Sequence, residues 1–158
     1  MKIAVISDTH RLSKYINLSK ELISDCDVLI HLGDNTDDIA ELTSDFYGEV
    51  YAVKGNCDYE NKYPKEQLLT FMDKKIFITH GDLYGVKDGM TNIYYKGKEV
   101  EADIVLFGHS HIHQITEYDN IIFMNPGSIS LPRSNGRYVG IIELSQGNKP
   151  DVYLESIL

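Results

Sequence analysis

Residues 2–10 read KIAVISDTH, a run of four apolar residues followed, after one serine, by an aspartate and a histidine. The apolar run predicts a buried β-strand over residues 2–7. Two more such runs follow, and segments with helical spacing of apolar residues separate the three. The expected strands cover residues 2–7, 28–31 and 49–53, and the expected helices cover 36–42 and 14–24, the latter with Ser13 as its N-cap. This alternation predicts a mostly parallel sheet with helices packed outside it.

The second half of the chain has a different pattern, in which short strands are joined mainly by turns. The expected strands cover residues 68–71, 75–79, 103–107, 115–118, 121–124, 138–144 and 152–157. Asp119-Asn120 predicts a hairpin turn, and a weakly patterned helix is expected over 89–98. Because no linker or repeat divides the chain, residues 1–158 are expected to form a single domain of the α/β class, a β-sandwich flanked by helices.

Charge and apolar content narrow the class of partner. The formal net charge of −9 argues against broad binding to nucleic acid or to an anionic membrane surface. The longest apolar runs have about five residues, far below the roughly 20 that span a bilayer, and no signal peptide is visible. The two cysteines, Cys26 and Cys57, have neither disulfide nor zinc-site spacing, so a reducing, cytoplasmic setting is expected.

Residues of metal-ligand type follow five of the predicted strands. These residues are Asp8 and His10, Asp34, Asn56, His80, and His109 with His111. In open α/β sheets, sites form beyond the carboxyl ends of the strands, on loops that the sheet holds rigid. A spacing of two residues would point both side chains to the same side of an extended segment, although in a loop such a pair could divide between two ions.

Each of these residues also has an ordinary structural interpretation. A single aspartate after a strand is most often a turn or cap residue, and a single buried histidine is most often a hydrogen-bonded core residue. His31 is expected to be such a core or supporting residue, and His113 is expected to be exposed. Turns and caps do not require carboxylate, amide and imidazole groups to gather at strand ends, so the whole set favours a metal site.

The same residues lie in motifs that resemble a known family, the calcineurin-like metallophosphoesterases. The motifs are Asp8-Thr9-His10, Gly33-Asp34, Gly55-Asn56-Cys57-Asp58, His80-Gly81 and Gly108-His109-Ser110-His111, in the order of the five blocks of that family. Asn125-Pro126-Gly127-Ser128 and the strand-rich tail resemble its small microbial phosphodiesterase branch. The resemblance implies a four-layer α-β-β-α sandwich with mixed sheets.

The resemblance also implies two metal sites that share one carboxylate. The first metal would be held by Asp8, His10 and His111, the second by Asn56, His80 and His109, and Asp34 would bridge both. Mixed nitrogen and oxygen ligands suit Mn²⁺, Zn²⁺, Fe, Co²⁺ or Ni²⁺ better than Ca²⁺. We expect two divalent ions, with Mn²⁺ favoured and Ni²⁺, Co²⁺, Zn²⁺, Fe or Mg²⁺ as alternatives.

The implied activity is hydrolysis of small phosphodiesters by a hydroxide that the two metals activate, with Asp34, Asn56 and His109 as catalytic residues. Many family members carry a histidine directly after the asparagine of the third block, and that histidine can help to protonate the leaving group. Here the position is Cys57, as is typical of the small phosphodiesterase branch. Good leaving groups, such as those of aryl diesters, are therefore expected to be preferred. Cys57, Asp58 and Arg11 are candidate substrate-binding residues.

Two alternative functions compete with the phosphodiesterase. The family resemblance includes a retromer subunit that serves as a protein-interaction scaffold, but such members have typically lost metal-block histidines that this chain retains. A phosphomonoesterase is the other alternative. A nuclease is disfavoured because the chain has no basic stripe to follow a backbone. The expected partner is a small phosphodiester or nucleotide, with no membrane or nucleic acid, and the strand-rich tail could pair in a homodimer or higher homo-oligomer.

Overall fold

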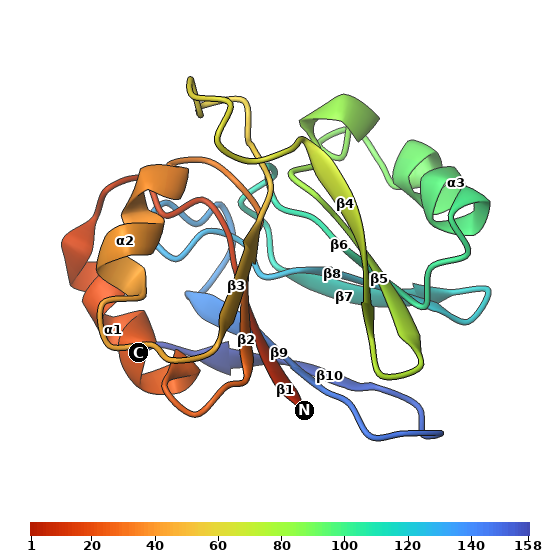
Figure 1. Cartoon of the computed structure of the whole chain (residues 1–158). Coiled ribbons are helices and arrows are strands. Elements are labelled where there is room, and N and C mark those ends of the chain that lie inside the picture. Colours follow the sequence, from red (N-terminus) through yellow and green to blue (C-terminus); the bar gives the residue numbers. More distant parts are fainter.

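The computed structural model describes all 158 residues, and their strands form two five-stranded sheets (Figure 1). The first sheet has the order β10-β9-β1-β2-β3. Its strands are β1 (Lys2–Ile6), β2 (Val28–His31), β3 (Glu49–Ala52), β9 (Tyr138–Glu143) and β10 (Asp151–Ser156). β1, β2 and β3 run parallel, and β9 joins β1 antiparallel, pairing Ala4 with Ile141. The sheet is therefore mixed, because two strands from the end of the chain complete it.

The second sheet has the order β4-β5-β6-β8-β7 and is also mixed. Its strands are β4 (Glu66–Phe71), β5 (Lys74–Thr79), β6 (Ile104–Leu106), β7 (Gln114–Tyr118) and β8 (Ile121–Asn125). β5, β6 and β8 run parallel, while β4 and β7 pair antiparallel at the two edges. The predicted hairpin turn at Asp119-Asn120 joins β7 to β8, and both of its residues have the left-handed backbone that such turns require.

Helices cover the outer face of each sheet. The helical elements are α1 (Ser13–Ile23), the one-turn α2 (Ile39–Leu42) after a 3₁₀ turn η1 (Thr36–Asp38), a second 3₁₀ turn η2 (Asp82–Tyr84), and α3 (Thr91–Glu99). Ile16 and Ile23 of α1 pack on the outer face of the first sheet, and Ile93 of α3 packs against Phe77 and Phe123 of the second. None of these helices has the length and apolar character that crossing a membrane requires.

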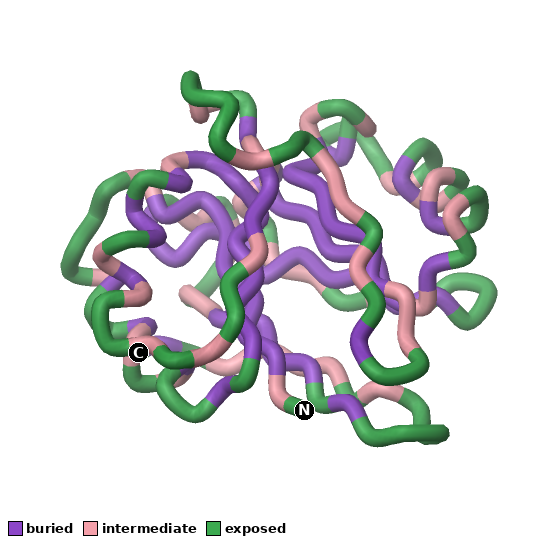
Figure 2. Tube along the Cα trace, in the orientation of Figure 1, coloured by how far each residue is buried: buried purple, intermediate pink, exposed green.

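The main core lies between the two sheets, where buried segments of both face each other (Figure 2). Val5 and Ile30 of the first sheet pack there with Ile78, Leu106 and Met124 of the second, all fully buried. The architecture is thus the four-layer α-β-β-α sandwich that the family resemblance implies.

Several element boundaries differ from those expected. The first helix begins at Ser13 with Leu12 at the N-cap position, so Ser13 is not the cap; its hydroxyl donates instead to the carboxylate of Glu41, 3.0 Å away. The expected helix over 36–42 is a 3₁₀ turn followed by a single α-turn. β4 starts at Glu66 rather than Leu68, because pairing with β5 extends two residues beyond the apolar run.

The core between the sheets should dominate stability. Ile78→Ala on β5 empties a fully buried position, and we expect it to lower the free energy of unfolding by about 2–5 kcal/mol in urea titrations. Leu68→Ala on the neighbouring strand β4 is the matched control, because 47% of Leu68 is exposed, and its effect should stay below about 1 kcal/mol. Similar losses for the two variants would contradict this placement of the core.

Candidate metal centre

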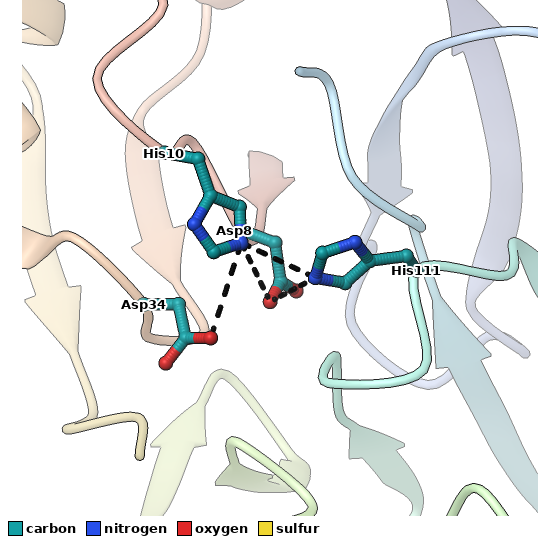
Figure 3. A group of neighbouring side chains, drawn as sticks. All are labelled: Asp8, His10, Asp34 and His111. Carbon is teal, nitrogen blue, oxygen red and sulfur yellow. Dashed lines mark hydrogen bonds and ion pairs between the residues drawn. The ribbon is translucent and has the colours of Figure 1, made fainter. Parts of the chain in front are cut away.

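Four side chains meet where loops following β1, β2 and β6 come together at one end of the sandwich (Figure 3). Asp8 and His10 follow β1, Asp34 follows β2 and His111 follows β6. One ligand atom from each lies within 4.8 Å of all the others. Asp8 Oδ1 is 3.1 Å from His111 Nε2 and 3.8 Å from His10 Nε2, and the two Nε2 atoms are 3.2 Å apart. The group thus offers two carboxylates and two imidazole nitrogens to one point.

A second group adjoins the first through Asp34. His80 Nε2 lies 3.0 Å from Asn56 Oδ1 and 3.2 Å from His109 Nδ1. Asp34 Oδ1 is 3.4 Å from His80 Nε2, whereas Asp34 Oδ2 is 3.9 Å from His10 Nε2 of the first group. Asp34 therefore presents one oxygen to each group, and the structure brings all seven residues singled out in the sequence into two adjoining clusters.

His109 and His111 divide between the two groups, although they are two residues apart. Both residues have left-handed backbones, with φ of 65° and 58°, so the segment is not extended and its side chains do not share one side. Of the two arrangements that the spacing left open, the structure has the divided one.

One buried atom in the centre has no hydrogen-bond partner. Asp8 is fully buried, and its Oδ2 accepts hydrogen bonds from the Ser7 hydroxyl and from the backbone N–H of His109. Its Oδ1 has no partner, which is costly for a buried carboxylate unless a cation is bound there. This oxygen faces the two imidazole Nε2 atoms of the first group, so the residues present fit a bound metal ion.

Backbone carbonyls orient two of the imidazoles toward the centre. His80 Nδ1 lies 2.7 Å from the carbonyl of Leu32, and His111 Nδ1 lies 2.8 Å from that of Leu131. Each Nδ1–H donates to its carbonyl, which leaves Nε2 as the atom that faces the carboxylates. Metal-binding histidines are commonly held in this way by a bond from the other ring nitrogen.

The charges of the centre shift its pKa values strongly. Burial opposes ionisation of Asp8, but His10 and His111 outweigh it and the pKa of Asp8 is lowered. Burial likewise lowers the pKa of His80, but Asp34 and Asp8 outweigh it and raise the pKa to about 9. The pKa of His109 is lowered by its burial and by the charges of His80 and Lys87. In the metal-free protein, a protonated His80 thus supplies the positive charge beside the carboxylates that a bound cation would otherwise supply.

The backbone adopts an uncommon conformation at most of the ligand positions. Five of the seven residues have φ between 45° and 65°, namely Asp8, His10, Asp34, His109 and His111. Outside glycine this region is sparsely populated, and Asn, Asp and His enter it most readily. Gly108 allows the close approach of the two sheets here, because a Cβ on it would lie 2.0 Å from Ser7 Oγ and 2.7 Å from Asp8 Oδ2.

Several residues that support the centre were missed in the sequence. Ser128 and Ser130 donate hydroxyl hydrogen bonds to the backbone carbonyls of Asp8 and Thr9, and Asn125 donates to the carbonyl of Gly108. All three donors are buried. They hold the left-handed ligand loops from the side of β8. The motif Asn125-Pro126-Gly127-Ser128 carried this signal, but the sequence does not show which backbone groups it contacts.

Asp58 connects two of the ligand loops through hydrogen bonds to their backbones. Its carboxylate accepts hydrogen bonds from the backbone N–H groups of Asp34, Thr36 and Gly55, at 2.8–2.9 Å. It therefore ties the loop after β2 to the loop after β3. Its candidate role in substrate binding stays a prediction, with most of its hydrogen-bonding capacity already used.

Cys57 and Arg11 lie beside the centre and line a hollow of about 170 Å³. The backbone N–H of Cys57 donates to Asp34 Oδ1 at 2.8 Å. Burial and the nearby charge of Asp34 raise the pKa of the Cys57 thiol to about 11, so in the metal-free protein it is neutral at pH 7. The Arg11 side chain is 70% exposed, 4.0 Å from Asp37. Their assignment to substrate binding also stays a prediction.

The two remaining histidines have structural surroundings. His31 is fully buried, accepts a hydrogen bond from the N–H of Gly33, and has a pKa lowered by burial to about 4. It is a supporting residue, as expected. His113 was expected to be exposed, and this is wrong: it is half-buried, bonded to Ser134 at 2.8 Å and packed on the ring of Tyr138.

The raised pKa of His80 predicts a pH dependence in the metal-free protein. Its stabilising charge is fully present below pH 6.5, the ordinary pKa, and is lost as the pH rises through about 9. In EDTA, the free energy of unfolding should fall by roughly 2 kcal/mol between about pH 6.5 and pH 9.5. Affinity for a divalent cation should rise over the same interval, because binding displaces the proton. His80→Gln should show a smaller fall; an equal fall would contradict the assignment.

Comparisons with known proteins agree with this centre. The family model for the calcineurin-like phosphoesterase superfamily domain matches residues 1–147. A Bacillus subtilis protein named "probable metallophosphoesterase YsnB" is 38% identical over 134 residues, which cover 84% of this chain and 78% of that protein.

Two solved structures share the fold. An archaeal phosphodiesterase has a TM-score of 0.79 at 24% identity, over 98% of this chain and 100% of that one. Vps29 from Entamoeba histolytica, complexed with Zn²⁺, has a TM-score of 0.80 at 16% identity over 100% of both chains. The chain therefore belongs to the calcineurin-like phosphoesterase superfamily, as its sequence motifs predicted.

Proposed function

We propose that the protein is a phosphodiesterase that hydrolyses small substrates at a centre of two divalent metal ions. The family and its named relatives support a metal-dependent phosphoesterase. The observation that carries the two-metal proposal is the position of Asp34, whose two carboxylate oxygens face the two ligand groups separately.

The proposed ligand assignment follows the two groups. Asp8, His10 and His111 would hold one ion, Asn56, His80 and His109 the other, and Asp34 would bridge them. Mixed imidazole, amide and carboxylate donors suit such divalent ions better than Ca²⁺. Among them we favour Mn²⁺ because of the resemblance to manganese-supported members of the family, with Ni²⁺, Co²⁺, Zn²⁺, Fe and Mg²⁺ as alternatives. Two such ions would supply a strongly nucleophilic water at neutral pH and neutralise the charge that develops on the phosphoryl oxygens.

The protein's own groups would then orient the reaction. Asp34 fixes the distance between the two groups, and the Cys57 N–H holds its Oδ1 in place. Asn56 is exposed and His109 half-buried, so the substrate would enter past these two side chains. Asp8 and His80 are fully buried and would serve as anchors that solvent does not reach.

The position after Asn56 supports a diester with a good leaving group. A neutral Cys57 thiol is a poor proton donor to a departing alkoxide. An aryl diester needs little such help, because its leaving group is stable as an anion. The archaeal phosphodiesterase that shares the fold is compatible with this preference.

Replacing the thiol tests this point. Turnover of aryl phosphodiesters should exceed that of alkyl monoesters, and Cys57→His should raise the relative rate for alkyl esters by at least about tenfold, because an imidazole can protonate the leaving group. Cys57→Gln, of similar size but without a titratable proton, is the control. Comparable turnover of aryl diesters and alkyl monoesters by the unaltered protein would contradict the proposal.

The scaffold alternative has the same fold. Likeness to Vps29 shows the architecture, and an architecture does not decide between a catalytic and a binding role. The side chains favour catalysis: all seven candidate ligands are present, and the unpaired Asp8 Oδ1 lies among them. A scaffold would not need that arrangement.

The bridging role of Asp34 has a direct test. We expect Asp34→Asn to lose bound metal and to slow hydrolysis by about 10²-fold or more, since it removes the negative charge that both groups share and replaces one of the two oxygens with an amide nitrogen. Metal content would be measured by elemental analysis, and activity after adding single metals to stripped protein, against aryl monoesters, aryl diesters and nucleotides. Asp45→Asn, at an exposed position away from the centre, is the control. Unchanged metal content and activity in Asp34→Asn would refute the bridge, and no activity with any metal would favour the scaffold.

We also propose a reducing compartment such as the cytoplasm, because Cys26 and Cys57 are both free thiols. The expected partner is a small phosphodiester or nucleotide. β7 and β10 are edge strands, and either could pair in a homodimer.

A further inference from the structure

A hollow of about 220 Å³, lined by polar residues and glycine, borders the proposed metal centre at Asn56. Its lining contains no hydrophobic side chain and consists of Lys54, Gly55, Asn56, Asp58, Lys65 and Asp82. Asn56 also contacts His80 in the second ligand group, at 3.0 Å. A molecule whose phosphorus lay at the centre could therefore extend directly into this hollow.

The fold holds two lysines on its wall. Lys54 lies two residues beyond the end of β3, and its backbone N–H donates to the carbonyl of Pro64 at 2.7 Å. This bond closes the loop between β3 and β4, so that Lys65 lies beside Lys54. The Lys54 ammonium donates to Asn61 of the same loop at 2.7 Å. The loop, yellow in Figure 1, stands next to the green turn η2 that carries Asp82.

Six of the twelve lysines of the chain form ion pairs, and six, including Lys54 and Lys65, do not. Lys2, Lys75 and Lys149, for example, form ion pairs with Asp25, Glu101 and Glu117. Neither Lys54 nor Lys65 forms an ion pair with a carboxylate. In a protein of net charge −9, Lys54 and Lys65 therefore bring two cations that are not ion-paired to the lining of one hollow.

The carboxylates of the hollow differ in their availability. Asp58 is bonded to three backbone N–H groups, whose dipoles weaken the negative potential that it presents to the hollow. Asp82 has no hydrogen bond to a side chain or ion pair to offset its charge, and it opposes the binding of an anion. In formal charge the two lysines balance Asp58 and Asp82. An ammonium group on a flexible stem can follow a phosphate or carboxylate as it enters.

We propose that this hollow is a subsite for a second anionic group of the substrate, a phosphate or a carboxylate, held by Lys54 and Lys65. The inference rests on the proposed function and narrows its substrate class. The preferred substrates are phosphodiesters that carry a further anionic group near the scissile phosphate. An uncharged aromatic group has no apolar wall to pack against in this hollow.

Two esters that differ by one phosphate provide the test. The first is thymidine 5′-(p-nitrophenyl phosphate), and the second is the same ester with an added 3′-phosphate. Hydrolysis of each ester by the metal-loaded protein is measured from the p-nitrophenol that it releases. We expect KM to be about three- to tenfold lower for the ester with the extra phosphate, with similar kcat, because two ammonium groups bind it. The advantage should shrink as the salt concentration rises.

Three variants connect this advantage to the hollow. Lys65→Gln should lower the KM ratio between the two esters to half of its value or less, because one ammonium group is lost. Asp82→Asn should increase the ratio, because an opposing charge is lost. Lys62→Gln is the matched control, because Lys62 is an exposed lysine of the same loop that does not line the hollow, and it should keep the ratio. Turnover of both esters with equal KM, or an unchanged ratio in Lys65→Gln, would overturn the subsite alone. Absence of turnover of both esters with every added metal would overturn the proposed function and the subsite with it.

Discussion

The carboxylate of Asp8 joins the two sheets at the point where the candidate centre forms. Asp8 follows β1, the central strand of the first sheet. Its Oδ2 accepts a hydrogen bond from the backbone N–H of His109, which follows a strand of the second sheet. Because Gly108 has no side chain, its backbone can lie close enough to Ser7 and Asp8 for this bond to form. Because the carboxylate is fully buried, its charge must be balanced by the surrounding imidazoles or by a cation. The position of the other ligands follows from this constraint.

The conformation of each ligand loop is held by hydrogen bonds from other segments of the chain rather than by the loop's own sequence. Asp58 ties the loop after β2 to the loop after β3, and Ser128 and Ser130 hold the loop after β1 from the β8 side. A loop with several left-handed residues would be poorly defined in isolation. Here backbone groups of each such loop are bonded to side chains from elsewhere in the chain. The result is a rigid arrangement of donors, which a binuclear centre needs if the spacing of its ions is to be fixed.

The parts of the structure that could be predicted from the sequence are local in origin. Apolar runs marked the strands, and the side chains directly after them marked the centre, because the end of a strand fixes where the next residue lies. The antiparallel addition of β9 and β10 to the first sheet is a long-range pairing with no local signal, and only the family resemblance implied mixed sheets. The division of His109 from His111, and the surroundings of His113, depend on loop backbones that strand periodicity cannot define. Ser13 failed as a cap because the helix starts one residue earlier and the hydroxyl has Glu41 as a partner.

The left-handed backbone at five ligand positions has a consequence for how such a chain can change over evolution. Asp, Asn and His tolerate this conformation better than other residues with a side chain, and they are also the residues that would bind metal here. Two independent requirements thus select the same few amino acids at each position. A descendant that abandoned catalysis would still be held by the backbone requirement, and its simplest replacements there would be asparagine or glycine. A β-branched residue would disturb the loop as well as the chemistry. Loss of activity in such a lineage should therefore leave a narrow and recognisable set of substitutions, with the surrounding sandwich intact.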